Sequence, residues 1–482
     1  MIRQINRVTA GLIFLLVALI INISYIQVFE AKSLRSQTNN QRALLAEYTR
    51  QRGPILIGSQ PLANSVTTTD ALTYLRTYAQ GPDFASVTGY YSLVYGATGI
   101  EAKENDILAG NDSRFFVDRL QQLIANRKPK GGAVRLTLNP DAQVAAMKGL
   151  AGRTGAVVAI NATTGEILAM ASSPSFDPNL LSSHDPASIK KTYDALNADP
   201  KEPLLNRSLA LTLPPGSTFK LVTAAAALES GKYTLNSVIP APASIPLAGS
   251  TRRLNNWTGQ ACGPGNKTTL KHALAISCNT AFALLGIQLG EKALYDEAQK
   301  FGFEHSFDTP LVSATSHFPT QLDEAQLAMS AIGQFDVRAT TLQMALVAAG
   351  IANDGVVMRP YLISQVMAPN LAVLQNSVPS AYGRVLTSDH ATELQSMMID
   401  VVNNGTGSNG RISGVVVGGK TGTAENVPGE SAHAWFVAFA KGTNGPIAVA
   451  VMLQHGGGAT EVSGNGLAAP IANAVLRAAL KQ

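Results

Sequence analysis

A serine and a lysine three residues apart are the first side chains in this sequence that could do chemistry together. Ser217 and Lys220 lie in the run 214–220, whose prolines and glycine end any preceding element, so we expect a helix to begin at Ser217. Residues three apart share one face of a helix. Lys220 is the only charge between Thr218 and Leu228, which predicts a buried lysine with a lowered pKa, because burial disfavours the charged form. A neutral amine beside a serine hydroxyl can activate it as a nucleophile.

A second motif places a hydroxyl and an amide in one short loop. Ser277, Cys278 and Asn279 stand between the apolar helical stretches 270–276 and 280–289. The hydroxyl of Ser277 can relay a proton, and the amide of Asn279 can hold a substrate carbonyl. Taken alone, the motif is more often a helix N-cap.

A third motif lies where a valine-rich strand ends. Lys420 and Thr423 offer hydrogen-bond donors to a carboxylate, and Gly422 lets a ligand backbone come close. Each motif by itself has an ordinary structural explanation, and Ser-x-x-Lys arises often by chance. In this order, however, Ser-x-x-Lys, Ser-x-Asn and Lys-Thr-Gly form the signature of penicillin-binding proteins and serine β-lactamases. Together they predict a serine acyl-transfer enzyme.

Two distant groups of strands are expected to position these motifs. Residues 155–160 and 167–170 are apolar runs joined by a glycine-bearing turn, which predicts a hairpin. Three further strands and a final helix are expected at 414–423, 435–440, 447–453 and 469–480. The stretches between the two groups are mostly helical, as at 218–229, 270–276 and 321–332. An antiparallel sheet with helices inserted between its strands is an α+β fold.

The N-terminal segment predicts a membrane span. Residues 8–29 are 22 residues without a charge, about 33 Å as a helix, which is enough to cross a bilayer core of about 30 Å. Arg3 and Arg7 precede this segment and favour a cytoplasmic N-terminus. A cleaved signal peptide is the alternative, but its apolar region is only about 7–15 residues long and ends at a small-residue site, which residues 23–28 do not offer. We therefore expect a retained anchor, with the rest of the chain outside the cytoplasm.

Composition narrows the class of protein. The 482 residues are 46% hydrophobic and 14% charged, so the chain can bury a substantial core. The net charge of +5 is scattered and includes no Lys/Arg run, so nucleic acid is not an expected partner. Two cysteines exclude a disulfide-dense scaffold and a four-cysteine zinc site. No metal or cofactor is expected.

Over nearly its whole length the sequence resembles the class B penicillin-binding proteins, which are monofunctional peptidoglycan D,D-transpeptidases. Residues 40–42 and 52–55 resemble the first conserved box of their N-terminal module, and residues 98–101 and 108–110 resemble a later one. Further matches are at 165–172, 206–207, 332–334 and 341–345. Residues 88–91 and the compact N-terminal module are most similar to the actinobacterial cell-division member. The sequence departs from the pattern at Cys278, where serine or aspartate is commoner, and at Gly58-Ser59, where the turn is usually acidic.

The resemblance implies a fold and a division of the chain. The fold is that of penicillin-binding transpeptidases, similar to serine β-lactamases, with an antiparallel five-stranded sheet and helices on both sides. Residues 1–30 would form a cytoplasmic tip and a transmembrane anchor. Residues 31–150, which begin with a polar stalk at 31–50, would form a small non-catalytic α+β module comparable to a pedestal or dimerisation module. Residues 151–482 would form the transpeptidase domain.

The resemblance also implies residue roles. Ser217 would attack the penultimate D-alanine carbonyl of a stem peptide and release the last D-alanine, while Lys220 takes the serine proton. Ser277 would relay a proton to the leaving group, and Asn279 would orient the peptide. The implied substrate-binding residues are Lys420, Thr421, Gly422 and Thr423. The implied partners are stem peptides ending in D-Ala-D-Ala, β-lactams as covalent inhibitors, the membrane, and other cell-wall synthesis or division proteins.

A disulfide between Cys262 and Cys278 is also expected. These are the only cysteines, and an exported chain meets an oxidising compartment. Residues 263–266 provide a flexible return between them. Because Cys278 lies between Ser277 and Asn279, the bond would order the loop that carries both side chains. The alternative is a pair of buried thiols.

Other activities fit the sequence less well. A bifunctional enzyme needs a glycosyltransferase domain, for which residues 31–150 are too few. A secreted β-lactamase would lack those residues, and a β-lactam-sensing receptor would carry several membrane spans and a cytoplasmic domain. A D,D-carboxypeptidase is nearer, because it shares the acyl-enzyme, but the N-terminal module argues against it. Three intact motifs argue against a catalytically inactive scaffold.

Overall fold

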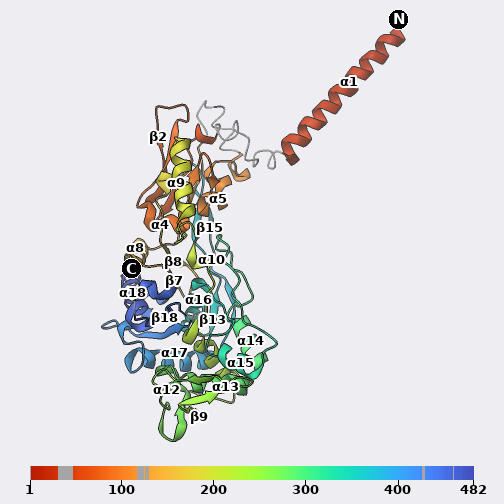
Figure 1. The fold of residues 1–482 in the computed structure, drawn as a ribbon. Helices are drawn as coiled ribbons and strands as arrows, with labels where there is room; N and C mark the ends of the chain where they lie inside the picture. The colour runs from red at the N-terminus through yellow and green to blue at the C-terminus, as the bar shows by residue number, and fades with distance from the viewer. Residues whose placement is uncertain are drawn as a thin grey trace.

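The computed structural model of this chain describes residues 2–30, 47–116, 124, 130–425, 429–459 and 461–481 (Figure 1). Helix α1 (Ile2–Tyr25) is followed by a π-helical turn, η1 (Ile26–Glu30). Within α1, Ile5–Tyr25 is long and apolar enough to cross a membrane, with a mean hydropathy of 2.3. The predicted span at 8–29 therefore lies in helix. Most of the predicted stalk at 31–50, and the box at 40–42, lie outside the described residues.

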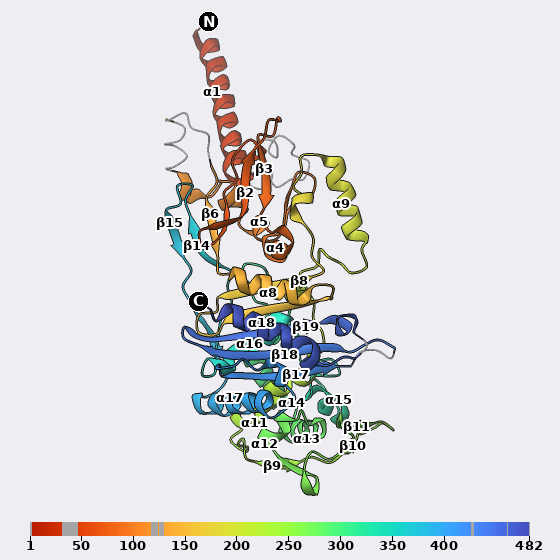
Figure 2. The ribbon, with the colours of Figure 1, turned by 90° about the vertical axis from the view of Figure 1, so that its left-hand side faces the viewer.

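A five-stranded antiparallel sheet forms the centre of the larger part of the molecule. Its order is β17-β18-β19-β7-β8, so strands from both predicted groups meet in it, as expected. The strands are β7 (Gly155–Asn161), β8 (Ile167–Ser173), β17 (Val417–Ala424), β18 (His433–Gly442) and β19 (Gly445–Leu453). Figure 2 shows β8 on the side of the N-terminal module and β17 at the opposite edge, beside α17 (Ser388–Asn403).

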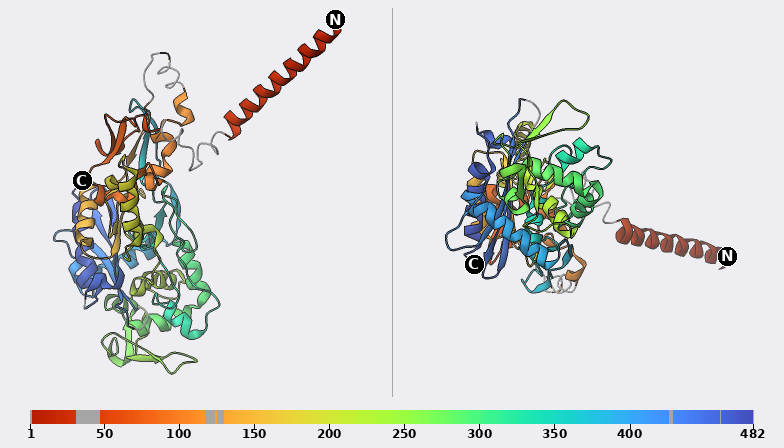
Figure 3. Two further views of the ribbon diagram at one scale, coloured as in Figure 1. Left: turned by 45° about the horizontal axis from the view of Figure 1, so that its top comes forward. Right: turned by 90° about the horizontal axis from the view of Figure 1, so that it is seen from below.

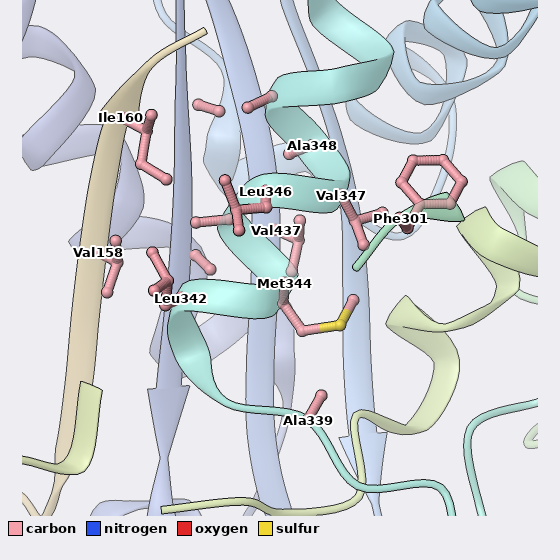
Figure 4. Packing of buried hydrophobic residues seen from close by; sticks show 14 of the residues in the cluster. Val158, Ile160, Phe301, Ala339, Leu342, Met344, Leu346, Val347, Ala348 and Val437 are labelled. Carbon is pink, nitrogen blue, oxygen red and sulfur yellow. The ribbon is translucent and has the colours of Figure 1, made fainter. Parts of the chain in front are cut away.

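Helices cover both faces of this sheet. On one face lies α16 (Thr341–Ala352), whose residues are all buried. Val158, Ile160 and Val437 of the sheet face Leu342 and Leu346 of this helix (Figure 4). On the other face, α8 (Pro140–Leu150) and α18 (Ala469–Ala479) pack together in a separate apolar cluster. A strand covered on both faces is apolar at successive positions, which explains the unbroken apolar runs of the sequence.

A helical lobe lies beyond the β17 edge and carries two of the motifs. Its helices are α11 (Lys220–Glu229), α12 (Leu270–Ala275), α13 (Asn279–Leu289), α14 (Glu291–Lys300) and α15 (Glu324–Ser330). Two small ribbons lie at its far end, the first pairing β9 (Val238–Pro240) with β12 (Lys267–Thr269) and the second pairing β10 (Ser244–Pro246) with β11 (Arg253–Asn255). Figures 1 and 3 show these ribbons at the end of the molecule opposite the N-terminal module.

A second sheet, of six strands, forms the N-terminal module. Its order is β15-β14-β6-β1-β2-β3, with β1 and β6 parallel and the other pairs antiparallel. The strands are β1 (Ile55–Ile57), β2 (Gln60–Thr67), β3 (Tyr74–Tyr78), β6 (Ala133–Leu136), β14 (Ile363–Met367) and β15 (Val373–Asn376). Short helices accompany them: α4 (Gly81–Thr88), α5 (Gly99–Lys103) and α6 (Asn105–Leu108).

The structure differs from the predicted division at residue 150 in three places. Helix α8 precedes that boundary but packs on the catalytic sheet. Strands β14 and β15 follow it but complete the N-terminal sheet, because β6 needs a partner along its second edge. Helix α9 (Pro186–Ala198) also follows it, and Ile189 of α9 packs with Ala85 of α4. Local sequence patterns show which segments are strands but not which strands pair.

Among the described residues, the remaining α-helix and β-strands are short, and several 3-10 and π-helical turns lie between the larger elements. The short elements are α10 (Arg207–Ala210), the pair β4 (Tyr91–Ser92) and β5 (Gly96–Ala97), and the pair β13 (Val356–Met358) and β16 (Ala381–Arg384).

The N-terminal module is held together by a buried ionic cluster. Glu101 receives Nε of Arg52 and Nε of Arg76, each at 2.6 Å. Tyr78 Oη donates to the same carboxylate at 3.2 Å, and Arg52 Nη1 donates to Asn105 Oδ1 at 2.7 Å. Burial would raise the pKa of Glu101, but the two guanidinium groups outweigh it and lower that pKa. The carboxylate therefore stays ionised and cross-links three segments of the module.

Candidate active site

Ser217 lies in a single 3-10 turn, η4 (Gly216–Thr218), directly before α11. The α-helix thus begins at Lys220 rather than at Ser217, because the chain turns sharply at Gly216, where φ is +53°. A Cβ at Gly216 would stand 2.8 Å from the carbonyl oxygen of Thr423, so only glycine lets the turn approach β17 this closely. The carbonyl of Gly333 accepts the Gly216 N–H at 2.9 Å and supports the turn from behind.

Lys220 is fully buried beside the Ser277–Asn279 loop. Its Nζ lies 2.9 Å from Ser277 O, 2.7 Å from Asn279 Oδ1 and 3.4 Å from Ser277 Oγ. Burial, and then the like charge of Lys420, lower its pKa well below the ordinary value. The predicted buried lysine is therefore present, and it is poised to be a neutral amine.

Lys420 reaches the same hydroxyl from β17. Its Nζ lies 2.8 Å from Ser277 Oγ and 2.9 Å from Thr421 O, and its side chain is fully buried. Burial lowers its pKa to about 7. Among the described residues, neither Lys220 nor Lys420 forms an ion pair with a carboxylate, so nothing there restores the charged form of either amine.

Ser277 is held between the two amines in a conformation that few residues adopt. Its φ is +60°, in the left-handed region, which costs a non-glycine residue about 1 kcal/mol or more. Lys220 donates to its carbonyl, and the Cys278 N–H donates to Ala273 O at 2.8 Å on its other side. The surrounding contacts thus keep the Ser277 hydroxyl pointing between Lys220 and Lys420.

The Ser277–Asn279 loop is also tied to the segment 255–262. Asn279 Nδ2 donates to Asn255 O at 3.1 Å, and Trp257 Nε1 donates to Ile276 O at 3.2 Å. Cys262 and Cys278 form a disulfide with a Cα–Cα distance of 6.2 Å, in agreement with the pairing that the sequence predicts. The buried Asn256, which no motif indicates, contacts the loop as well.

Strand β17 runs past the serine turn as an edge strand and presents the third motif. Thr423 is exposed, whereas Thr421 is largely buried and its Oγ1 lies 2.7 Å from Oγ1 of Thr406. A Cβ at Gly422 would stand 2.9 Å from Pro215 O, so this glycine lets the strand lie against the serine turn. The side chain of Thr421 therefore points into the protein, and only that of Thr423 faces solvent.

The structure brings the predicted residues together. Hydrogen bonds join Lys220, Ser277, Asn279 and Lys420, and the close contact of Gly216 with Thr423 places the Ser217 turn beside them. The supporting residues Asn256, Thr406 and Gly333 were not predicted as part of the site. The described residues contain no group of three or more His, Cys, Asp or Glu placed to hold a metal ion. Such a site can activate a hydroxyl and bind a carboxylate.

Comparison with protein families gives two matches. Residues 155–477 match the penicillin-binding protein transpeptidase domain. Residues 52–134 match the penicillin-binding protein A dimerisation domain. The second match covers strands β1, β2 and β3 of the six-stranded sheet and the first two residues of β6, but not β14 and β15.

Individual relatives agree with these matches. The chain is 43% identical to the peptidoglycan D,D-transpeptidase PbpA of Mycolicibacterium smegmatis and 42% identical to that of Mycobacterium tuberculosis, in each case over 99% of both chains. Among solved structures, it is similar to the ceftriaxone acyl-enzyme complex of penicillin-binding protein A from M. tuberculosis, with a TM-score of 0.88 and 42% identity. That match covers 91% of this chain and 100% of the other.

Proposed function

This chain belongs to the penicillin-binding protein transpeptidase family, and we propose that Ser217 is the residue on which it forms its acyl-enzyme. The chain is a serine-type peptidoglycan D,D-transpeptidase of cell-wall synthesis. One observation above all supports the choice of Ser217. The turn that carries it adjoins a buried network in which two lysines converge on Ser277, and neither lysine has a carboxylate partner in the described part of the chain.

Lys220 is the proposed general base. A neutral amine has two N–H groups and one lone pair, and the two N–H groups have acceptors in Ser277 O and Asn279 Oδ1. The lone pair is then free to take the proton of Ser217 as its Oγ attacks the penultimate D-alanine carbonyl. The new C–O bond replaces the C–N bond to the last D-alanine.

Ser277 is the proposed proton relay. Its Oγ lies 3.4 Å from Lys220 Nζ and 2.8 Å from Lys420 Nζ. The proton that Lys220 takes from Ser217 can pass through this hydroxyl to the leaving nitrogen, so D-alanine departs as an amine and Lys220 returns to its neutral form. An acceptor amine would then attack the ester and regenerate Ser217.

Strand β17 is the proposed binding edge. Lys420 and Thr423 would hold the terminal carboxylate, and Asn279 would orient the peptide. The backbone N–H groups of Ser217 and Thr423 would stabilise the oxyanion, an effect worth about 10²–10³ in rate per donor. Because the Thr421 side chain is turned inward to Thr406, its proposed contribution is to hold the strand, while Gly422 keeps the strand close to the serine turn.

The same chemistry accounts for β-lactam inhibition. Solved structures of the M. tuberculosis relative are ceftriaxone, imipenem and penicillin G acyl-enzyme complexes. A β-lactam carries a carboxylate and a strained amide, so it would occupy the β17 edge and acylate Ser217. Ring opening leaves the former leaving group attached, and the ester then blocks the site.

Mass spectrometry of the intact protein and of its digested peptides tests the assignment of Ser217. After incubation with penicillin G, the wild-type chain should gain the mass of one inhibitor on the peptide that contains Ser217. The variant Ser217→Ala should gain none. Ser230→Ala, at the opposite end of α11, is the matched control and should be labelled like the wild type. Labelling of Ser217→Ala at the wild-type rate would show that another residue is the nucleophile.

The chain is anchored to the membrane, and we propose a single pass with the catalytic domain outside the cytoplasm. The support is the apolar helix Ile5–Tyr25, with Arg3 on its N-terminal side. An alkaline phosphatase, which is active only outside the cytoplasm, should be active when it is fused after Gln482. A membrane-bound but inactive fusion at that position would indicate the opposite topology.

The division of labour along the chain is also proposed, with residues 31–150 mainly a non-catalytic module and residues 151–482 mainly the transpeptidase. A role in cell division, alongside other cell-wall synthesis or division proteins, rests on the resemblance to actinobacterial cell-division members. A fluorescent fusion should gather at the septum, and depletion should give elongated cells with few septa. Uniform growth of the side wall after depletion would argue for another role.

A further inference from the structure

Asn256 is a buried side chain close to the reaction centre that no sequence motif indicates. It is 4% exposed. Both of its neighbours in the chain are hydrogen-bonded to the catalytic loop or the residue before it: Asn255 O accepts from Asn279 Nδ2, and Trp257 Nε1 donates to Ile276 O. Its carboxamide is hydrogen-bonded on both sides. Nδ2 donates to Pro242 O at 2.9 Å and to Gln260 O at 2.8 Å.

The oxygen of this carboxamide takes the place of a missing helix cap. Helix α13 begins at Asn279, and its N-cap residue, Cys278, makes no side-chain capping bond because its sulfur is bonded to Cys262. The first N–H groups of a helix have no partner within the helix. Oδ1 of Asn256 accepts those of Asn279 and Thr280, each at 3.0 Å. An asparagine 23 positions upstream thus caps the helix that carries a catalytic amide.

This cap acts on the proposed base through one side chain. The backbone N–H of Asn279 is bonded to Asn256, while its side-chain Oδ1 accepts from Lys220 at 2.7 Å. The orientation of the Asn256 carboxamide has no alternative, because a flip would set its NH₂ against two N–H groups and its oxygen against two carbonyls. Any displacement of the N-terminus of α13 would therefore move one of the two acceptors that direct the lone pair of Lys220.

We propose that Asn256 is a positioning residue for acyl-enzyme formation, which sets the place of Asn279 and, through it, the direction of the Lys220 amine. The inference rests on the proposed roles of Ser217 and Lys220. The two ends of the Asn256 carboxamide can be tested separately. Oδ1 accepts hydrogen bonds from the catalytic loop, so the acylation rate should depend on these bonds. Nδ2 donates to Pro242 and Gln260 in the ribbon segment, so thermal stability should depend on those bonds.

The experiment measures the first-order acylation constant at saturating cephalosporin, together with the melting temperature, for Asn256→Ala and Asn256→Asp. Asn256→Ala removes both the acceptor oxygen and the donor nitrogen. It should acylate about 10²-fold more slowly, which is the effect expected when a catalytic group is displaced by about 1 Å. Asn256→Asp keeps an acceptor for the two N–H groups but loses both donors. It should acylate within about threefold of wild type and melt at or below the temperature of Asn256→Ala, because its second oxygen would face the carbonyls of Pro242 and Gln260.

Asn139→Ala is the matched control. Asn139 is also 4% exposed and also caps a helix, accepting the Ala142 N–H at 2.9 Å, but its helix α8 lies on the other face of the sheet. This variant should melt at a lower temperature and acylate at the wild-type rate. Acylation of Asn256→Ala at the wild-type rate would overturn the inference. If Asn256→Ala does not fold, acylation of Asn256→Asp more than tenfold below wild type would overturn it instead. Ser217→Ala is run alongside, because labelling of that variant would refute the nucleophile and not the cap.

Discussion

Two buried clusters of charged side chains lie in the two parts of this molecule, and their electrostatics are opposite. In the N-terminal module, Arg52 and Arg76 share the carboxylate of Glu101. In the catalytic part, Lys220 and Lys420 converge on the hydroxyl of Ser277, and no carboxylate pairs with either among the residues that the structure describes. Both clusters are almost completely removed from solvent.

The difference separates a structural cluster from a reactive one. An ion pair moves each pKa away from neutrality, so Glu101 keeps its charge at every physiological pH and can only hold the chain together. Two buried amines without an anion have their pKa values lowered toward neutrality, so they can exchange protons during turnover. Changes in the first cluster should therefore cost stability, and changes in the second should cost rate.

The largest expected effect is on rate. Lys220→Met replaces the amine with an apolar side chain of similar length and removes the general base. The second-order constant of acylation should fall by about 10³-fold, within the range of general-base catalysis. The free energy of unfolding should change by less than about 1 kcal/mol, because the relief from burying an amine offsets the cost to Ser277 O and Asn279 Oδ1, which lose their donor. Stopped-flow mixing with a chromogenic cephalosporin and denaturant unfolding measure the two quantities.

Lys300→Met is the control for that variant. Lys300 lies on α14, is partly exposed, and has a carboxylate partner in Glu297 at 2.9 Å. Its loss should leave acylation unchanged. A large loss of stability in Lys220→Met with an intact acylation rate would reverse the roles of the two clusters.

Glu101→Gln should show the opposite pattern. It leaves two buried guanidinium groups without an anion, and breaking a buried pair in this way costs about 3–5 kcal/mol of unfolding free energy. The folded fraction should acylate at the wild-type rate at low temperature. Glu104→Gln is the comparison, since Glu104 takes part in none of the ion pairs found in the described part of the chain. Equal stability of the two variants would mean that the cluster does not hold the module together.

The smallest expected effect is the pH dependence, which sharpens the contrast within the lysine pair. Acylation requires neutral Lys220, so its rate should rise with pH through the lowered pKa of that group. It also requires charged Lys420 to hold the inhibitor carboxylate. Burial lowers the pKa of Lys420 to about 7, so acylation should fall by up to about tenfold per pH unit above that value.

Replacing Lys420 with arginine tests whether the charge of Lys420 causes the fall of the acylation rate at high pH. Lys420→Arg stays charged across the range, so the variant should lose the decline at high pH while keeping the rise at low pH. A wild-type rate that is constant from pH 7 to 9 would show that the charge of Lys420 does not limit carboxylate binding.

The parts of the site that the sequence predicts are those that depend on short spacing. Ser217 and Lys220 are three residues apart, and the apolar texture around Lys220 is enough to predict its burial. Ser277 and Asn279 stand in one loop, and the hairpin of β7 and β8 follows from two apolar runs and a turn. The two cysteines pair as predicted because no other partner exists for either one.

The parts that sequence reasoning missed depend on contacts between distant segments. Asn256 acts on Asn279 across 23 positions, and its only signal in the sequence is an asparagine just before a tryptophan. Strands β14 and β15 join the N-terminal sheet because β6 needs an edge partner there, which no periodicity reveals. The serine turn is 3-10 rather than α-helical because Gly216 must pass within contact of Thr423, a residue of another strand.

The order of the catalytic sheet has a consequence for the time course of folding. Strand β19 pairs with β7, although about 280 residues separate the two strands in the chain. At a synthesis rate of about 5–20 residues per second, β19 is therefore made roughly 15–60 s after β7. During that interval the apolar edge of the β7–β8 hairpin is open to wrong partners, which favours aggregation. The serine turn rests on β17, which is made almost as late. Nascent chains therefore cannot acylate until nearly all of the catalytic domain has been synthesised.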